Sequence, residues 1–137
     1  MRRYLLDTPI LAAYLNNRPW VVSVISPWII HHEVSTSILA YGEVTEYLRS
    51  ATNPDERQEH LRRLLRSVYP FFVSYRIMER YADLRRQMRP PHGPGLIGDI
   101  DTLIAATALQ RNLTVVTLDH DFRRVPGLKV MVLSRPR

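Results

Sequence analysis

The chain has 137 residues, of which 45% are hydrophobic and 23% charged, and these proportions are ordinary for a globular protein with one substantial core. It has no cysteine, which excludes disulfides and thiolate zinc sites, and no apolar run reaches the roughly 18 residues that a membrane-spanning helix requires. These two features favour a cytoplasmic protein. The formal net charge is +6, and Lys129 is the one lysine among 19 basic residues, which favours an anionic partner.

The N-terminal part of the chain predicts one strand and two helices. Residues 3–6 are apolar enough for a short buried strand, and residues 8–15 predict a helix that tolerates Pro9 in its first turn. Polar turn residues then separate this helix from a second one over residues 20–30. Pro27 lies inside the second helix and is expected to kink or split it.

The next segment predicts a second strand and two more helices. The strand is expected over residues 32–36, and His31 and His32 are interpreted as residues at its edge. Neighbouring strand residues point to opposite faces, so the two histidines are not expected to chelate one metal ion. Ser37 is expected to cap a helix to about residue 50, and Asn53 a helix over residues 54–68.

The C-terminal half predicts three strands and two helices. A short strand over residues 71–73 leads into a helix over residues 74–88, and the prolines and glycines of residues 89–95 indicate an exposed loop. Asp99 is expected to cap a helix that runs to about residue 112. The remaining strands are expected over residues 113–118 and 129–133.

Helical stretches separate most of these strands, which favours parallel pairing through right-handed crossovers. The expected fold is therefore a three-layer α/β/α sandwich with a mostly parallel, roughly five-stranded sheet. Residues 1–137 are expected to form one domain.

Acidic side chains recur where strands end and helices begin. Asp7 and Asp119 each follow an apolar strand, while Glu43 and Asp101 lie in the first or second turn of predicted helices. In an open parallel sheet, ligands bind in the crevice at the carboxyl ends of the strands. Carboxylates that converge there repel one another unless a hard cation neutralises them. The pattern therefore predicts a Mg²⁺ or Mn²⁺ site.

Each acid also has a purely structural explanation. Asp7 could serve only as a helix cap, and Glu43 could face solvent. Either Asp99 or Asp101 is enough to cap their shared helix, and Asp119 lies where turn residues are common. The joint pattern, with an acid at each of four converging positions, is what favours the metal site.

Four segments carry a more specific pattern. They are Tyr4–Thr8, Ser37–Val44, Asp99–Leu109 and Val115–Phe122. In this order they resemble the motifs of the PIN-domain ribonucleases, particularly the VapC-type toxins of VapBC toxin–antitoxin systems. The resemblance implies a PIN-like fold in which Asp7, Glu43, Asp101 and Asp119 are the catalytic, metal-binding acids. Five residues are secondary candidates, either as further acids or as hydroxyl groups that orient carboxylates or phosphate: Asp99, Asp121, Thr8, Ser37 and Thr117.

The resemblance also implies an activity and its partners. The expected reaction is metal-dependent endoribonuclease cleavage, in which metal-activated water leaves 5′-phosphate and 3′-hydroxyl ends. The expected cofactor is Mg²⁺ or Mn²⁺ and the expected substrate is RNA. A small antitoxin protein and a second copy of the chain are the expected protein partners.

Arginine side chains suit bidentate contacts with phosphate, which makes several of them candidates for binding RNA. The candidates flank the loops around the predicted pocket: Arg18, Arg85, Arg86, Arg89, His92, Arg123 and Arg124. A solvated charged face is the alternative explanation for any one of them, and arginine enrichment can also follow genome composition.

Three other functions fit parts of the pattern. A PIN nuclease of RNA maturation or decay would share the acids without an antitoxin. A receiver-like signalling domain would also gather acids at strand ends, but it needs a lysine after the last strand, and Lys129 begins that strand. A non-cleaving module that binds RNA or a protein partner would be separated from the enzyme by metal-affinity and activity assays.

Overall fold

A five-stranded sheet organises the chain in the order β3-β2-β1-β4-β5, with every neighbouring pair parallel. The computed structural model describes residues 1–136. The strands are β1 (Tyr4–Leu6), β2 (Val34–Ser37), β3 (Tyr69–Phe71), β4 (Thr114–Thr117) and β5 (Lys129–Val132). The prediction of a parallel, five-stranded α/β sheet is confirmed.

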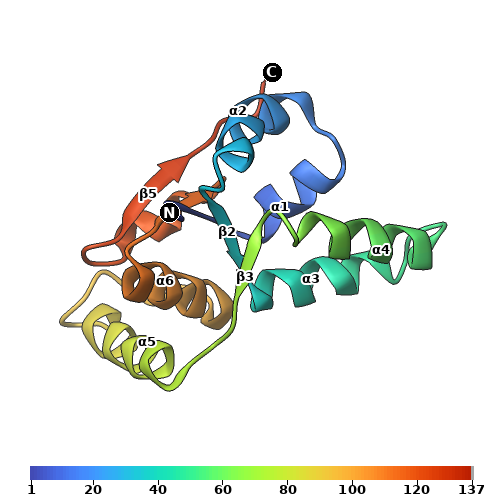
Figure 1. The fold of residues 1–137 in the computed structure, drawn as a ribbon. Coiled ribbons are helices and arrows are strands. Elements are labelled where there is room, and N and C mark those ends of the chain that lie inside the picture. Colours follow the sequence, from blue (N-terminus) through green and yellow to red (C-terminus); the bar gives the residue numbers. More distant parts are fainter. Residues whose placement is uncertain (137) are drawn as a thin grey trace.

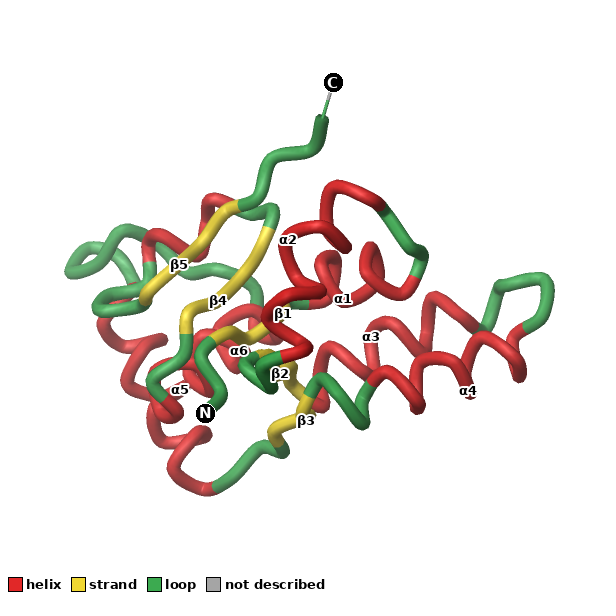
Figure 2. Tube along the Cα trace, turned by 45° about the horizontal axis from the view of Figure 1, so that its top comes forward, coloured by secondary structure: helices red, strands yellow, loops and turns green. Residues whose placement is uncertain are grey.

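In this described part of the chain, six α-helices and one 3₁₀ helix connect the strands. They are α1 (Thr8–Leu15), α2 (Pro19–Ile30), α3 (Ile38–Leu48), α4 (Pro54–Leu64), α5 (Tyr75–Met88), α6 (Asp99–Arg111) and η1 (His120–Arg124). Figure 1 shows α5 and α6 on one side of the sheet, α1 and α2 on the other, and α3 and α4 extending away from it as a pair. The tube view in Figure 2 shows the same grouping. Within residues 1–136, no helix combines the length and apolar character that crossing a membrane requires.

Alternating strand residues produce the three layers. Leu5 of β1 lies in the core cluster formed with α5 and α6, whereas its neighbour Leu6 lies in the cluster formed with α1 and α2. Val115 and Val116 of β4 divide between the same two clusters. Successive strand side chains point to opposite faces, so a sheet covered on both sides requires these continuous apolar runs.

Helix α2 continues through Pro27 from Pro19 to Ile30, so of the two expected effects of this proline, a kink or a split, the split does not occur. The expectation for the two histidines is wrong. His31 follows the end of this helix and His32 has a φ of 56°, in the left-handed region. The two histidines therefore form a turn before β2 rather than the edge of a strand.

Of the three expected helix caps, Ser37 and Asn53 lie where the sequence places them and Asp99 does not. Ser37 accepts a hydrogen bond from the Leu39 amide at 3.1 Å, which caps α3. Asn53 is the N-cap residue of α4, but its side chain makes no capping bond; its side-chain nitrogen Nδ2 donates instead to Glu56 Oε2 at 3.0 Å. The N-cap of α6 is Gly98, so the expectation that Asp99 caps this helix is wrong.

Candidate active site

Asp7 lies directly after β1 and is almost completely buried, with 2% of its surface exposed. One carboxylate oxygen, Oδ1, accepts a hydrogen bond from the Ile10 amide at 3.4 Å, so Asp7 caps α1 as the structural explanation expected. The other, Oδ2, accepts a hydrogen bond from the Thr117 hydroxyl at 2.5 Å. A cap needs only the first of these contacts, and caps are usually exposed to water. The depth of Asp7 therefore needs a second explanation.

Thr117 connects two of the predicted acids. It ends β4, the strand that pairs with β1, and its hydroxyl accepts a hydrogen bond from the Asp119 amide at 3.0 Å while donating to Asp7. The Asp119 carboxylate accepts a hydrogen bond from the Asp121 amide at 2.8 Å and so caps η1. Because β1 and β4 are parallel, both acids lie at the same edge of the sheet.

Glu43 reaches this edge from α3. Its Oε1 accepts a hydrogen bond from the Thr8 hydroxyl at 2.5 Å, and Thr8 directly follows Asp7 in the chain. The carboxylate is exposed, as one of the sequence-based explanations expected, but the bond to Thr8 holds it beside the start of α1. Ser37 lies at the N-terminal end of α3, the helix that carries Glu43, and its hydroxyl caps this helix.

Asp101 brings the fourth carboxylate from the first turn of α6. Partial burial raises its pKa first, and repulsion by Asp119, Glu43 and Asp121 raises it further. Each of these three acids is therefore close enough for its negative charge to act on Asp101. Such mutual repulsion is the expected property of carboxylates gathered in one crevice.

The electrostatics of Asp7 point in the same direction. Burial raises the pKa of Asp7 to about 7, the hydrogen bonds from Thr117 and Ile10 oppose this rise, and the charges of Asp101 and Asp119 add to it. Among the described residues 1–136, no basic side chain contributes to holding Asp7 ionised. The cluster of Asp7, Glu43, Asp101 and Asp119, called the carboxylate cluster below, thus lacks a compensating positive charge.

The donor set of the carboxylate cluster fits a hard divalent cation, because every donor is a carboxylate oxygen. Within residues 1–136, no three acidic or histidine side chains are close enough together to hold an ion by themselves. Mg²⁺ usually takes only one or two carboxylates and keeps several waters or substrate oxygens. An open arrangement of separated carboxylates is therefore compatible with that ion.

Each of the two secondary acids forms an ion pair with an arginine. Asp99 accepts a bond from Arg85 at 2.6 Å and another from the Tyr81 hydroxyl at 3.1 Å. Asp121 pairs with Arg124 at 3.0 Å, although its charge still acts on Asp101. Asp99 and Asp121 therefore each have a positively charged partner, whereas the burial of Asp7 is not compensated in this way.

The predicted RNA-binding arginines divide into three groups. Arg85 and Arg124 are engaged by the secondary acids. Three others are exposed: Arg86, Arg89 and Arg123. Arg18 lines a hollow beside α1, together with Arg135, a residue that no sequence motif singles out. Residue 135 is far from the first two helices in the chain, so no local sequence pattern could indicate that it lies beside them.

The Thr117 hydroxyl gives a direct test of the geometry at Asp7. Thr117→Val keeps the shape of the side chain but removes the donor to Asp7 and the acceptor for the Asp119 amide. We expect a loss of about 1–3 kcal/mol in the free energy of unfolding, because buried polar groups are left without a partner. Urea denaturation at neutral pH measures it.

Thr114→Val on the same strand is the matched control. Thr114 begins β4 and is only half-buried, whereas Thr117 is fully buried, so replacement of Thr114 should change the free energy of unfolding by less than about 0.5 kcal/mol. Equal effects of the two substitutions would contradict the role of Thr117 in holding Asp7.

Known proteins share the sequence pattern and the fold of this chain. The PIN domain profile matches residues 4–128, which is most of the chain. No curated protein sequence gives a significant match. The fold is similar to three solved structures that cover nearly the whole chain. VapBC2 from Rickettsia felis bound to promoter DNA has a TM-score of 0.83 and 22% identity, and the match covers 96% of this chain and 98% of that chain. DNA-bound VapBC from Salmonella typhimurium has a TM-score of 0.85 and 18% identity, with 96% of this chain and 98% of that chain covered. VapBC-1 from nontypeable Haemophilus influenzae has a TM-score of 0.80 and 21% identity, with 94% of this chain and 96% of that chain covered.

Proposed function

The chain belongs to the PIN-domain family, and on that premise we propose that it is a single-domain, Mg²⁺- or Mn²⁺-dependent endoribonuclease. The observation that carries this proposal is the carboxylate cluster. Asp7 is buried, no basic side chain of residues 1–136 stabilises its charge, and its pKa is raised partly by Asp101 and Asp119. A cation is the physical partner that such a cluster lacks.

Each acid has a distinct part in the proposed mechanism. Asp7 and Asp101 are the residues that would hold the ion directly, while Glu43 and Asp119 would complete the site through water or a second ion. A bound divalent ion supplies a water of lowered pKa and neutralises charge on the phosphate. Thr117 and Thr8 fix the orientation of Asp7 and Glu43 through their hydroxyl groups. The hydrogen bond to the Asp121 amide orients Asp119.

The products test this mechanism. Water attack bypasses the ribose 2′-hydroxyl, so we expect RNA fragments with 5′-phosphate and 3′-hydroxyl ends, formed in Mg²⁺ or Mn²⁺ and not in EDTA. Ligation-dependent mapping of RNA ends reads both termini. A 2′,3′-cyclic phosphate, or equal cleavage in EDTA, would contradict the proposal.

We further propose that the nuclease is the VapC-type toxin of a toxin–antitoxin pair that acts in the cytoplasm. The support is the likeness to solved structures described as VapBC from three bacteria. The proposed partners are a small antitoxin protein and a second copy of this chain. Co-purification with the product of a neighbouring small gene, with inhibition of RNA cleavage in the complex, tests the pairing.

A further inference from the structure

A hollow of about 420 Å³ lies beside the start of α1, outside the carboxylate cluster. One face of α1 forms its floor, with the residues Pro9, Ala12, Ala13 and Asn16. Their spacing places them along a single side of the helix, since residues three and four apart are neighbours there. The two alanines are short, which leaves room above the helix for a ligand.

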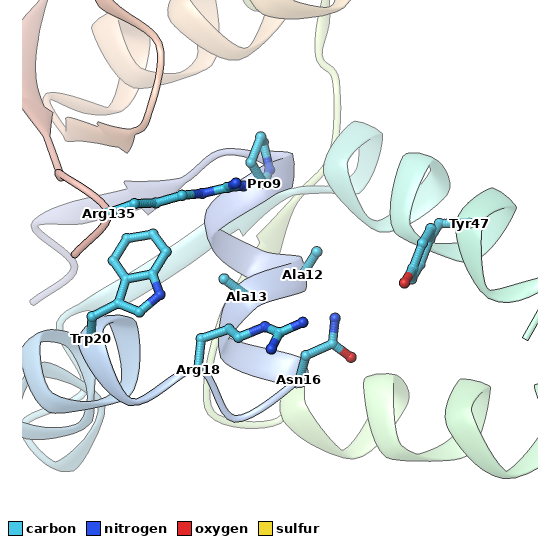
Figure 3. A pocket seen from close by; sticks show the side chains of 8 residues that line it. All are labelled: Pro9, Ala12, Ala13, Asn16, Arg18, Trp20, Tyr47 and Arg135. Carbon is cyan, nitrogen blue, oxygen red and sulfur yellow. The ribbon is translucent and has the colours of Figure 1, made fainter. Parts of the chain in front are cut away.

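The walls of this hollow carry cations and aromatic rings. They are Arg18, Trp20, Tyr47 and Arg135, and with the floor residues they define what we call the basic groove. Figure 3 shows the Arg135 side chain reaching from the C-terminal segment toward Pro9, with Trp20 on the same side and Tyr47 on α3 opposite. The groove thus joins residues from α1, α2, α3 and the C-terminal segment.

All the charged side chains that line the basic groove are positive. No carboxylate lines it, and within residues 1–136 neither Arg18 nor Arg135 takes part in an ion pair. A second hollow continues from Tyr47 and is lined by Arg57, again without an acid. An occupant with repeated negative charge would satisfy these exposed guanidinium groups.

The position of the groove relates it to the carboxylate cluster. Pro9 begins the floor only two residues after Asp7, and the other floor residues lead away from the cluster along α1. The sign of the charge therefore changes from negative to positive along one short helix. Helix α1 has 8 residues and is therefore about 12 Å long, so a phosphodiester chain with one phosphate at the carboxylates would bring phosphates farther along the strand to the arginines.

The aromatic side chains indicate single-stranded nucleic acid rather than a duplex. Trp20 is half-buried in the wall of the groove, and Tyr47 leaves 61% of its surface exposed. Bases can stack on such rings only when they have left their own stack, which single strands and loops permit. Arginines beside an exposed ring combine phosphate contact with base stacking.

We propose that the basic groove is the subsite for the single-stranded RNA next to the scissile phosphate, with a base stacked on Trp20 and phosphates on Arg18 and Arg135. This proposal rests on the proposed nuclease function for its substrate. It adds the residues that determine how the RNA strand enters and leaves the carboxylate cluster.

The test measures RNA binding separately from RNA cleavage. The anisotropy of a short fluorescein-labelled oligoadenylate gives its affinity in EDTA, where a metal-dependent nuclease does not cut. Trp20→Leu keeps an apolar side chain in the wall but removes the stacking surface, and we expect about tenfold weaker binding. Arg18→Ala combined with Arg135→Ala should lower the slope of the affinity against salt concentration, on logarithmic scales, by about 0.7 for each phosphate that these arginines neutralise.

Arg76→Ala combined with Arg80→Ala is the matched control for charge. Both residues are exposed on α5, which packs on the opposite face of the sheet from the groove. This pair should change the affinity by less than about twofold, although it removes the same net charge. Equal losses from the two pairs would indicate non-specific attraction and overturn the subsite.

Further outcomes distinguish this proposal from the nuclease proposal. RNA cleavage by the wild-type chain with no effect of the groove substitutions on binding or kcat/KM would overturn the subsite and leave the nuclease standing. Binding that requires Trp20, without cleavage in Mn²⁺, would support the subsite and overturn the nuclease. An acidic peptide that binds through Trp20 while oligoadenylate does not would make the groove a protein site and overturn the RNA assignment.

Discussion

Asp7→Asn is expected to abolish RNA cleavage and, at the same time, to stabilise the metal-free protein. Asparagine keeps the cap on α1 through its Oδ1, and its Nδ2 takes the place of Oδ2 and can donate to the Thr117 hydroxyl, but it carries no charge for a cation. The rate of cleavage should fall by more than roughly a hundredfold. Removing a residue that only hydrogen-bonds to a metal ligand already lowers activity by up to about this factor, and Asp7 is proposed to be a ligand itself. The pKa of Asp7 is about 7 in the folded protein, against an ordinary value of 3.8. Keeping Asp7 ionised in the folded protein therefore lowers the free energy of unfolding by about 4 kcal/mol, and an uncharged asparagine avoids this loss.

Two measurements check this pair of effects. Cleavage rates in Mn²⁺ and urea denaturation in EDTA, both at about pH 8, give the activity and the free energy of unfolding. Asp83→Asn is the matched control, because Asp83 is exposed on α5 and should change neither quantity appreciably. An Asp7→Asn variant that cleaves normally, or that unfolds more easily than the wild type without metal, would contradict the proposed site.

The placement of the acids could be predicted from sequence because it depends on local signals. Asp7 stands between an apolar strand and a Thr-Pro helix start, and Asp119 follows another apolar strand. Parallel strands place their carboxyl ends at one edge, so the two acids had to approach each other once the strands were right. The metal-binding role of these acids stays a prediction.

Contacts between distant elements could not be predicted in this way. Asp99 pairs with Arg85 because α5 packs against α6, and nothing in the spacing of these residues determines that packing. The same is true of Thr8 and Glu43, which are 35 residues apart. Arg135 reaches the basic groove only because the C-terminal segment passes beside α2. Side-chain partners of this kind depend on the tertiary fold rather than on periodicity.

The local errors have a similar cause. A helix over α2 is expected from its apolar residues, but the sequence alone could not show that packing on the sheet would carry the helix through Pro27. The turn at His32 requires a positive φ, which is uncommon for histidine and is therefore not expected from its type. Packing outweighs the local preference at Pro27. At His32 the positive φ ends α2 locally, because the His32 and Glu33 amides donate to the Ile29 and Trp28 carbonyls.

Without metal, the protein is expected to lose stability as the pH rises from about 4 to about 7. The pKa of Asp7 is raised in the folded state, so the folded chain binds more protons than the unfolded chain between these values. The free energy of unfolding therefore falls with rising pH in this window, and the effect is complete above the folded pKa. Burial and repulsion raise the pKa of Asp101 as well, which acts in the same direction.

Subtracting the pH profile of Asp7→Asn from that of the wild type isolates this contribution, because other carboxylates titrate in both proteins. The difference should grow to about 4 kcal/mol by pH 8 in EDTA, and saturating Mn²⁺ should reduce it by stabilising only the wild type. Thermal or urea denaturation across the pH range measures it. If the two profiles ran parallel, or if Mn²⁺ stabilised both proteins equally, the buried carboxylate would not be the group that a cation neutralises. The carboxylate cluster would then need another explanation.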